Sequence, residues 1–259
     1  MGIRQQEINV QLTDNLRGGY RFLEGISPYC SGVIANSGYE IVHVTLQQQL
    51  PWKQGMLAAR QYIGERNLPS FALCGFELRC SRPYSMDGFI DFNTGYCSVL
   101  KEWDMYVDGV NPVARTCVAP VVDAPRETML FGFSYCTGST TAWETFVVAG
   151  GGELTGSLRE GDIVREGETD DDAMADKAQA VVNLMNDRLT ALGADPEKLT
   201  TVDIYTAHPL AEIYRTVVIP GIPGVAGLGA QWFLSRPPIE DIEFEMDMRG
   251  VRTEHVLKL

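Results

Sequence analysis

The chain has 259 residues, with 34 acidic and 21 basic side chains, and its formal net charge is −13. So acidic a chain lacks the basic surface by which proteins bind nucleic-acid phosphates or anionic membranes. No apolar run approaches the roughly 18 residues of a transmembrane helix, and residues 1–6 lack the apolar stretch of a secretory signal. We therefore expect a cytoplasmic protein of one or two domains, with no membrane or nucleic-acid partner.

The sequence contains no motif typical of a metal or nucleotide site. Its six cysteines form no Cys-x-x-Cys pair and its three histidines lie far apart, so a zinc site is not predicted. Residues 150–152 are glycines after an apolar run, but no Gly-x-Gly-x-x-Gly opens a helix. We expect free, buried thiols, no metal and no organic cofactor.

The first half of the chain is expected to contain two helices among strands. An apolar run within residues 38–46 predicts a strand. Pro51 lies near the start of a segment, 51–65, whose apolar residues recur at spacings of three and four, and this predicts a helix. The elements that follow are a strand over 71–78, a helix over 89–103, and strands over 117–122 and 129–133.

The second half repeats this order with clearer signals. Thr169 and Asp172 form a capping box before a long apolar periodicity, which predicts a helix ending at Gly193. Residues 242–248 alternate between apolar and charged, which predicts a half-buried antiparallel strand. The other expected elements are strands over 146–149, 200–206 and 231–234, a shorter helix over 209–217 and a loop over 220–229.

The matching element order indicates an internal duplication. A short echo supports it, because Pro28–Gly32 (PYCSG) resembles Ser134–Gly138 (SYCTG). We predict two similar domains, residues 1–130 and 131–259, each of ordinary domain size.

Five segments resemble, in the same order, motifs of the Rid/YjgF family of reactive-intermediate deaminases. They are Pro28–Val33 (PYCSGV), Phe89–Tyr96 (FIDFNTGY), Pro112–Val118 (PVARTCV), Phe146–Tyr205 and Pro237–Met248. The resemblance implies an α+β fold of two tandem Rid-like (chorismate-mutase-like) domains, each a mostly antiparallel sheet with two helices on one face. It also implies a homo-oligomer, a trimer or a multiple of one, with clefts between neighbouring domains.

The resemblance also assigns roles to residues. Arg115 matches the family arginine that binds the substrate carboxylate, and Cys117 matches the cysteine two positions later. Tyr29 matches a tyrosine of the cleft, and Glu243 matches a glutamate that positions or activates water. A guanidinium suits a carboxylate because it donates two parallel hydrogen bonds. Without the resemblance, the same pattern predicts a structural ion pair at Arg115, an inert buried thiol at Cys117, and a solvated strand face at Glu243 and Glu245.

Further candidate site residues come from the repeated motif and from the end of a predicted strand. Tyr135 is expected to donate a hydrogen bond to substrate or to lie half-buried in the core. Arg79 and Arg82 flank Cys80, where they are expected to bind a second carboxylate or to form a loop ion pair. The second half lacks the family arginine and the first half lacks the family glutamate, so we expect a site composed across domains or chains.

Within the family, the chain most resembles two-domain bacterial enzymes that act on 2-aminomuconate or its chlorinated analogue in aromatic-compound degradation. The resemblance implies a cofactor-independent hydrolase of C–N bonds, which converts a dicarboxylate enamine to a 2-oxo or 2-hydroxy acid and ammonia. In this hypothesis Arg115 holds the carboxylate and Glu243 moves protons. Two alternatives stay open on the same fold: a ring-opening amidohydrolase or chorismate-cleaving enzyme, and a non-catalytic ligand-binding protein.

Overall fold

The computed structural model describes residues 12–156 and 161–259. Residues 1–6, on which the prediction of no secretory signal rests, lie outside this part of the chain. The described strands form one twelve-stranded sheet in the order β1-β2-β3-β8-β11-β9-β10-β6-β5-β7-β4-β12. The strands are β1 (Leu12–Asn15), β2 (Tyr20–Leu23), β3 (Gly32–Ala35), β4 (Tyr39–Pro51), β5 (Leu73–Arg79), β6 (Ala114–Pro120), β7 (Met129–Gly138), β8 (Phe146–Gly152), β9 (Thr201–Thr206), β10 (Gln231–Arg236), β11 (Phe244–Gly250) and β12 (Thr253–Leu257).

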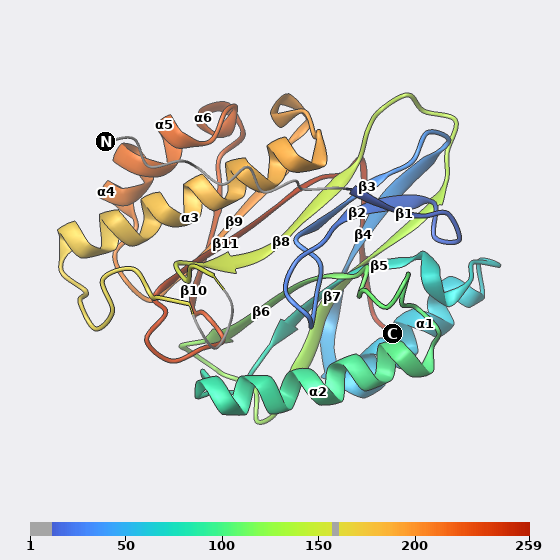
Figure 1. The fold of residues 1–259 in the computed structure, drawn as a ribbon, viewed down its shortest axis with the longest axis horizontal. Helices are drawn as coiled ribbons and strands as arrows, with labels where there is room; N and C mark the ends of the chain where they lie inside the picture. Colours follow the sequence, from blue (N-terminus) through green and yellow to red (C-terminus); the bar gives the residue numbers. More distant parts are fainter. Residues whose placement is uncertain (1–11, 157–160) are drawn as a thin grey trace.

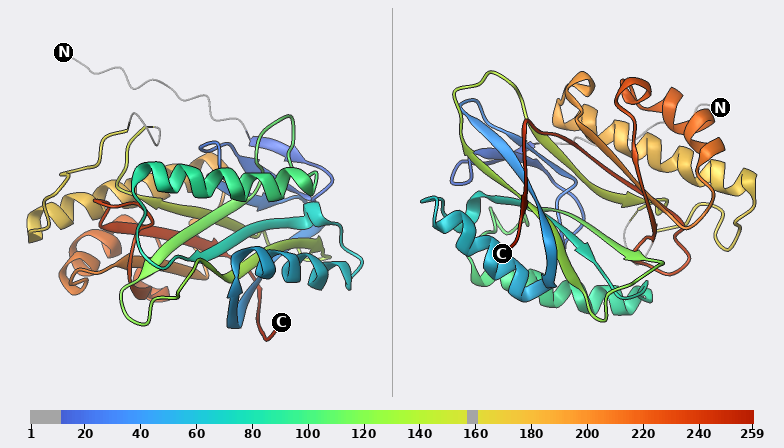
Figure 2. Two further views of the ribbon diagram at one scale, coloured as in Figure 1. Left: turned by 90° about the horizontal axis from the view of Figure 1, so that it is seen from below. Right: turned by 180° about the vertical axis from the view of Figure 1, so that it is seen from behind.

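Helices cover this sheet from two sides. They are α1 (Trp52–Gly64), α2 (Met86–Glu102), α3 (Asp171–Leu192), α4 (Ala211–Ile213), α5 (Ile219–Gly221) and α6 (Val225–Leu228). Figure 1 shows α1 and α2 on one side of the strands and α3 to α6 on the other, and the right-hand view of Figure 2, from behind, agrees. In the described residues, no helix is long and apolar enough to cross a membrane.

The sheet is mixed and mostly antiparallel. Among the described strands, the parallel neighbours are β5 with β6, β9 with β10, and β4 with β12. The α+β class predicted from the sequence is therefore confirmed. In the second half, the second helix consists of α4, a π-helical turn and α5, followed by the separate short helix α6.

Each half of the chain contributes a strand to the other half of the sheet. β3 pairs with β8, where Val33 lies opposite Val147. β7 continues without a break through Ser134–Gly138, the second copy of the repeated motif, and Cys136 there lies opposite Ile41 of β4. The boundary predicted at residue 130 therefore falls inside one strand, and the division into residues 1–130 and 131–259 stays a prediction.

The apolar side chains form a separate core under each group of helices. Met56 and Leu100 of α1 and α2 pack on the sheet of the first half, and Val181 and Met185 of α3 pack on that of the second. Full burial of one such side chain contributes roughly 1.5–3 kcal/mol. The spacings of three and four in the sequence thus mark the buried helix faces.

Helix α3 begins one residue later than the capping box predicts. Its N-cap is Asp170, whose carboxylate accepts a hydrogen bond from the amide of Ala173 at 2.9 Å. The acidic side chains of the first turn lie at the positive end of the helix dipole. At the other end Gly193 has the left-handed conformation, with φ of 67°, that the predicted stop requires.

The shorter helix of the second half also differs from its prediction. Helical structure runs from Ala211 to Gly221 through a π-helical turn, and α6 occupies part of the predicted loop. Pro220 lies near the C-terminal end of this helical segment. On β10, Trp232 and Leu234 are 49% and 45% exposed.

The charged face of β11 is buried, whereas the sequence predicted a half-buried strand. Glu245, Asp247 and Arg249 alternate with methionines along the strand and are 4%, 4% and 7% exposed. The prediction was wrong because strands of the first half cover this face. Thr116 of β6, for example, donates a hydrogen bond to Asp247 at 2.6 Å.

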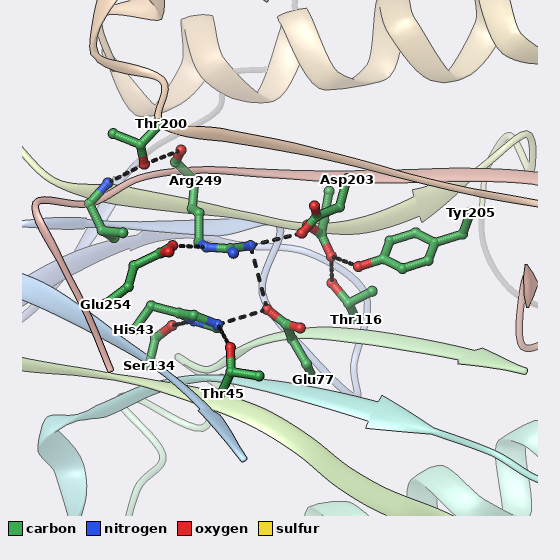
Figure 3. A network of polar contacts seen from close by, with 12 residues as sticks. His43, Thr45, Glu77, Thr116, Ser134, Thr200, Asp203, Tyr205, Arg249 and Glu254 are labelled. Carbon is green, nitrogen blue, oxygen red and sulfur yellow. Dashed lines mark hydrogen bonds and ion pairs between the residues drawn. The ribbon is translucent and has the colours of Figure 1, made fainter. Parts of the chain in front are cut away.

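Arg249 lies at the centre of a buried ion network between the halves (Figure 3). Its guanidinium donates to Asp203 and to Glu254, each at 2.8 Å, and lies 3.8 Å from Glu77. On the first-half side, His43 lies 3.5 Å from Glu77. Burial lowers the pKa of His43 to about 4, although Glu77 opposes this, so the imidazole is neutral at pH 7.

Candidate active site

A cavity of about 550 Å³ lies between the two halves of the chain. Its walls come from the loop before β3, from β6, from the end of β8, from α3 and from the start of β11. A cavity of this size suits a small organic molecule. Within the described residues, no group of three or more His, Cys, Asp or Glu side chains is placed to hold a metal ion. Residues of both halves therefore meet at one cavity within a single chain.

Arg115 of β6 lines this cavity and is 2% exposed. Its Nη2 donates to Oδ1 of Asn93 on α2 at 2.7 Å, and the rings of Tyr29 and Tyr96 lie 4.7 and 4.6 Å from its guanidinium carbon. Among the described residues its Nε and Nη1 have no hydrogen-bond partner. A buried guanidinium with unused donors favours an anionic ligand, because an unpaired buried donor costs about 1–3 kcal/mol.

Glu245 lines the cavity with Arg115 and is 4% exposed. Burial raises the pKa of Glu245 well above its usual value, Cys117 and Asp247 raise it further, and Arg188 and Arg115 oppose the rise. Such a carboxyl keeps its proton at pH values where an exposed glutamate is ionised. This property suits a group that gives and takes protons.

Glu243, to which the resemblance assigns the catalytic role, is not among the residues that line the cavity. Its carboxylate is bound by Arg236 and lies 3.0 Å from Nε2 of His208. Burial would raise the pKa of Glu243, but these two partners bring it below its ordinary value. The structure thus holds Glu243 as a charged ion-pair partner, and the expected solvated face is absent because Glu243 and Glu245 are both buried.

Tyr29 and Cys117 line the same cavity as Arg115. Burial raises the pKa of Tyr29, against the effect of Arg115, so its hydroxyl remains a neutral donor. A hydrogen bond from Cys80 lowers the pKa of Cys117, while burial opposes this and Arg115 assists it. The motifs around residues 29 and 115, far apart in the sequence, therefore supply neighbouring side chains.

Three residues considered from the sequence lie elsewhere. Tyr135 is buried in the first-half core, with its ring centroid 6.1 Å from that of Tyr62. Arg82 is exposed on the loop after β5. Arg79 is buried between the halves, with its guanidinium 3.9 Å from the ring centroid of Phe131. None of the three lines the cavity.

Arg188 of α3 also lines the cavity, although no motif marks it. Its Nη1 donates to the backbone carbonyls of Ala149 and Gly150 at 2.8 and 3.2 Å. These carbonyls lie beyond the last residue of β8 that pairs with β3, so the side chain occupies an open strand edge. The sequence contains only a weak signal for this residue, which lies four positions after Leu184 at the margin of the buried helix face.

Glycines at the end of β8 allow both of these side chains to approach the strand. A Cβ at Gly150 would lie 2.3 Å from Oε1 of Glu245 and 3.0 Å from Thr116, and a Cβ at Gly151 would lie 2.9 Å from Nη1 of Arg188. Successive strand residues point to opposite faces. The three glycines therefore leave room for Glu245 on one face of β8 and for Arg188 on the other. This packing accounts for the glycine run, so no nucleotide-binding role is needed to explain it.

Comparison with known proteins places this chain in a family. A sequence profile of the 2-aminomuconate deaminase CnbZ family matches residues 12–255. The chain belongs to this family. The 2-amino-5-chloromuconate deaminase of Comamonas testosteroni is 34% identical over 244 residues, which are 93% of this CnbZ-family chain and 96% of that protein. The likeness to two-domain deaminases of this type, inferred from the motifs, is thereby confirmed.

A solved structure shares the fold of this CnbZ-family protein. A chorismatase crystal structure covers 93% of this chain and 80% of its own, with a TM-score of 0.51 at 11% identity. Two smaller proteins of E. coli, TdcF with bound serine and the YjgF gene product, each cover 42% of this chain, at 13% identity and TM-scores of 0.29 and 0.27. They cover 81% and 80% of their own chains. The chorismatase likeness shows the fold and carries no information on the reaction.

Proposed function

We propose that this protein is a hydrolytic deaminase of 2-aminomuconate or its 5-chloro analogue, which releases ammonia and leaves a 2-oxo acid. The observation that carries the proposal is the meeting of Arg115, from the first half, and Glu245, from the second half, in one cavity. Membership of the CnbZ family and the similarity to the Comamonas protein support this substrate class.

In this proposal Arg115 holds the carboxylate next to the amine-bearing carbon. Its Nε and Nη1 are unpartnered in the described residues, and one of them together with the second hydrogen of Nη2 forms a fork of two donors for a carboxylate. Tyr29 lines the same cavity, and its hydroxyl is proposed to donate to the same carboxylate or to the nitrogen. Binding of the carboxylate would satisfy donors that the protein alone leaves unpaired.

Glu245 is proposed to move the protons of the reaction, in place of Glu243. Protonated Glu245 donates to the enamine carbon, and the C–N bond becomes an iminium. Water attacks the iminium carbon and gives its proton to the resulting carboxylate. That proton passes to the nitrogen, the C–N bond breaks, ammonia leaves, and the remaining hydroxyl proton returns to Glu245 as the C=O bond forms. The sum is enamine plus water to ketone plus ammonia.

The direct test is ammonia release from 2-aminomuconate and from 2-amino-5-chloromuconate by the purified chain. We expect turnover of at least one of them, with one ammonia formed for each substrate consumed. Loss of the conjugated absorbance without ammonia would contradict a deaminase, and so would the absence of any turnover.

Glu245→Gln is expected to lower kcat about 100- to 1000-fold, the usual size of a general acid–base contribution. KM should change much less, because the guanidinium of Arg115 is intact. The raised pKa of Glu245 also predicts an alkaline limb in the pH profile of wild-type kcat/KM, since the acid form is lost as pH rises through that pKa.

Glu243→Gln serves as the matched comparison for this variant. It changes the same chemical group two residues away, outside the cavity lining. We expect its kcat to stay within about fivefold of the wild-type value, since no proton transfer depends on it. Equal losses of kcat in the two variants, or a larger loss in Glu243→Gln, would indicate that Glu243 and not Glu245 transfers the protons.

Gly150→Ala is expected to lower kcat about 10- to 100-fold by displacing the carboxylate of Glu245. The added methyl group would lie 2.3 Å from Oε1 of Glu245, at the movable end of that side chain, and 3.0 Å from Thr116, so both side chains must shift. Steady-state kinetics with a urea unfolding curve measure both effects. Gly138→Ala, which has open space around its Cβ position, is the control and should keep wild-type kcat.

A further inference from the structure

Two guanidinium groups face the cavity, and the proposed chemistry uses only one of them. Arg115 comes from β6 and Arg188 from α3, so they enter from different halves of the chain. Arg188 is held in place by its bonds to the carbonyls of Ala149 and Gly150. In the described part of the chain these bonds use Nη1 alone, which leaves Nε and Nη2 for a ligand.

The carboxylates that line the cavity do not neutralise these two cations. Glu153 is bound by Lys177 at 3.2 Å and by the backbone amides of residues 243 and 244 at 2.6 and 3.0 Å. Glu24 and Asp187 are exposed, where solvent screens them. Glu245 holds its proton more tightly than an exposed glutamate, which reduces its negative charge. Among the described residues, neither Arg115 nor Arg188 forms an ion pair with a carboxylate.

The contacts around Arg188 hold its guanidinium in a fixed position, as in a preformed binding site. A Cβ at residue 151 would lie 2.9 Å from its Nη1 and 2.8 Å from Cδ2 of Leu184, so the glycine there lets the guanidinium pack closely against the strand. Burial lowers the pKa of Arg188, which means that its charged form lacks compensation in the unliganded protein. A ligand with a single anionic group would pair with one arginine and leave the other uncompensated.

We propose that Arg188 forms a second carboxylate subsite and makes the cavity selective for linear dicarboxylates over monocarboxylates. Arg115 takes the carboxylate at the reacting end, and Arg188 takes the carboxylate at the distal end. This assignment replaces Arg79 and Arg82, which the sequence offered for a second carboxylate and which lie outside the cavity. The inference deepens the proposed function and rests on it for the choice of this cavity as the substrate site.

The test compares two stable ligands that share a six-carbon diene skeleton. Hexa-2,4-dienedioate carries a carboxylate at each end, and hexa-2,4-dienoate carries one. Calorimetric titration of the full chain gives both dissociation constants without any turnover. For the wild-type protein we expect the dienedioate to bind about 30-fold or more tightly than the dienoate, the effect of a charge-assisted hydrogen-bonded pair.

Arg188→Gln is the decisive variant, because glutamine removes the charge but keeps a donor for the backbone carbonyls. We expect the preference for the dienedioate to fall below about threefold while the affinity for the dienoate stays within about threefold of wild type. Arg188→Lys, which restores the charge, should recover part of the preference. The inference is overturned if the wild-type protein shows no preference, if Arg188→Gln retains it, or if that variant weakens both ligands equally.

Ammonia release separates this inference from the proposed function. If the wild-type protein prefers the dienedioate through Arg188 but releases no ammonia from 2-aminomuconate, the carboxylate subsite is supported and the deaminase function is refuted. If the wild-type protein releases ammonia but Arg188→Gln keeps the ligand preference, the deaminase function is supported and the subsite at Arg188 is refuted.

Discussion

Replacing Arg115 by methionine is expected to lower kcat/KM for 2-aminomuconate about a thousandfold. Hydrogen bonds to a charged group contribute about 1.5–3 kcal/mol each, and Arg115 offers two unused donors. Since about 1.4 kcal/mol corresponds to a factor of ten in rate, the loss of both gives a factor of this order. Methionine fills a similar volume without a donor. Arg115→Lys, which keeps the charge but not the planar fork, should fall between the two.

The stability of the Arg115→Met variant distinguishes binding from a structural role. Arg115 leaves two nitrogens unpaired in the described structure and has one hydrogen bond, to Asn93. Its removal should therefore change the free energy of unfolding by less than about 1.5 kcal/mol. Arg126→Met, at an exposed position between β6 and β7, is the matched control and should retain full activity. Loss of activity with an equally severe loss of stability would contradict a role in substrate binding.

The largest effect on stability is expected for Arg249→Met. Arg249 is the shared partner of Asp203, Glu77 and Glu254, and the first two of these carboxylates are otherwise enclosed between the halves (Figure 3). Removing one member of a buried ion pair costs about 3–5 kcal/mol, because the remaining charge loses its compensation. Urea unfolding at pH 8 should show this loss. A value within about 1 kcal/mol of wild type would show that the network contributes little.

The effect of Arg249→Met should depend on pH in a defined direction. Burial raises the pKa of Asp203 to about 6, although Arg249 opposes the rise, and loss of the arginine raises it further. The folded variant thus binds this proton more tightly than the unfolded chain does, and its stability falls as pH rises through that pKa. The variant should be closer to wild type at pH 5 than at pH 8. Arg252→Met, at an exposed neighbouring position, should show neither effect.

Much of the fold could be predicted because its signals are local. Apolar spacing in α1 and α3, the glycine at residue 193, and the alternation in β11 each depend on residues close together in the chain. The errors occurred where tertiary contacts decide the outcome. Alternation in β11 shows which residues share a face, but whether water or another strand covers that face depends on β6, more than a hundred residues earlier.

In the candidate site, too, local motifs predicted some residues and tertiary contacts decided others. The motif around Arg115 predicted a substrate-binding residue; Arg115, Tyr29 and Cys117 line one cavity, and their roles stay predictions. Glu243 and Glu245 share a residue type and the alternation that predicts one strand face, so sequence spacing cannot distinguish them, although Glu243 lies just before β11. They differ in partners: Arg236 and His208 bind the first, whereas the second lies against Gly150.

The sequence alone predicted the α+β class through periodicity and caps, and the likeness to the family through short motifs, because these are properties of neighbouring residues. Only the tertiary structure decided that β3 and β7 cross between the halves, that one cavity joins Arg115 to Glu245, and that Arg188 faces it. The physical reason is that burial and charge compensation depend on distances between residues remote in the chain. The formal charge of −13 describes the whole composition, whereas the cavity presents two cations without ion-pair partners among the described residues.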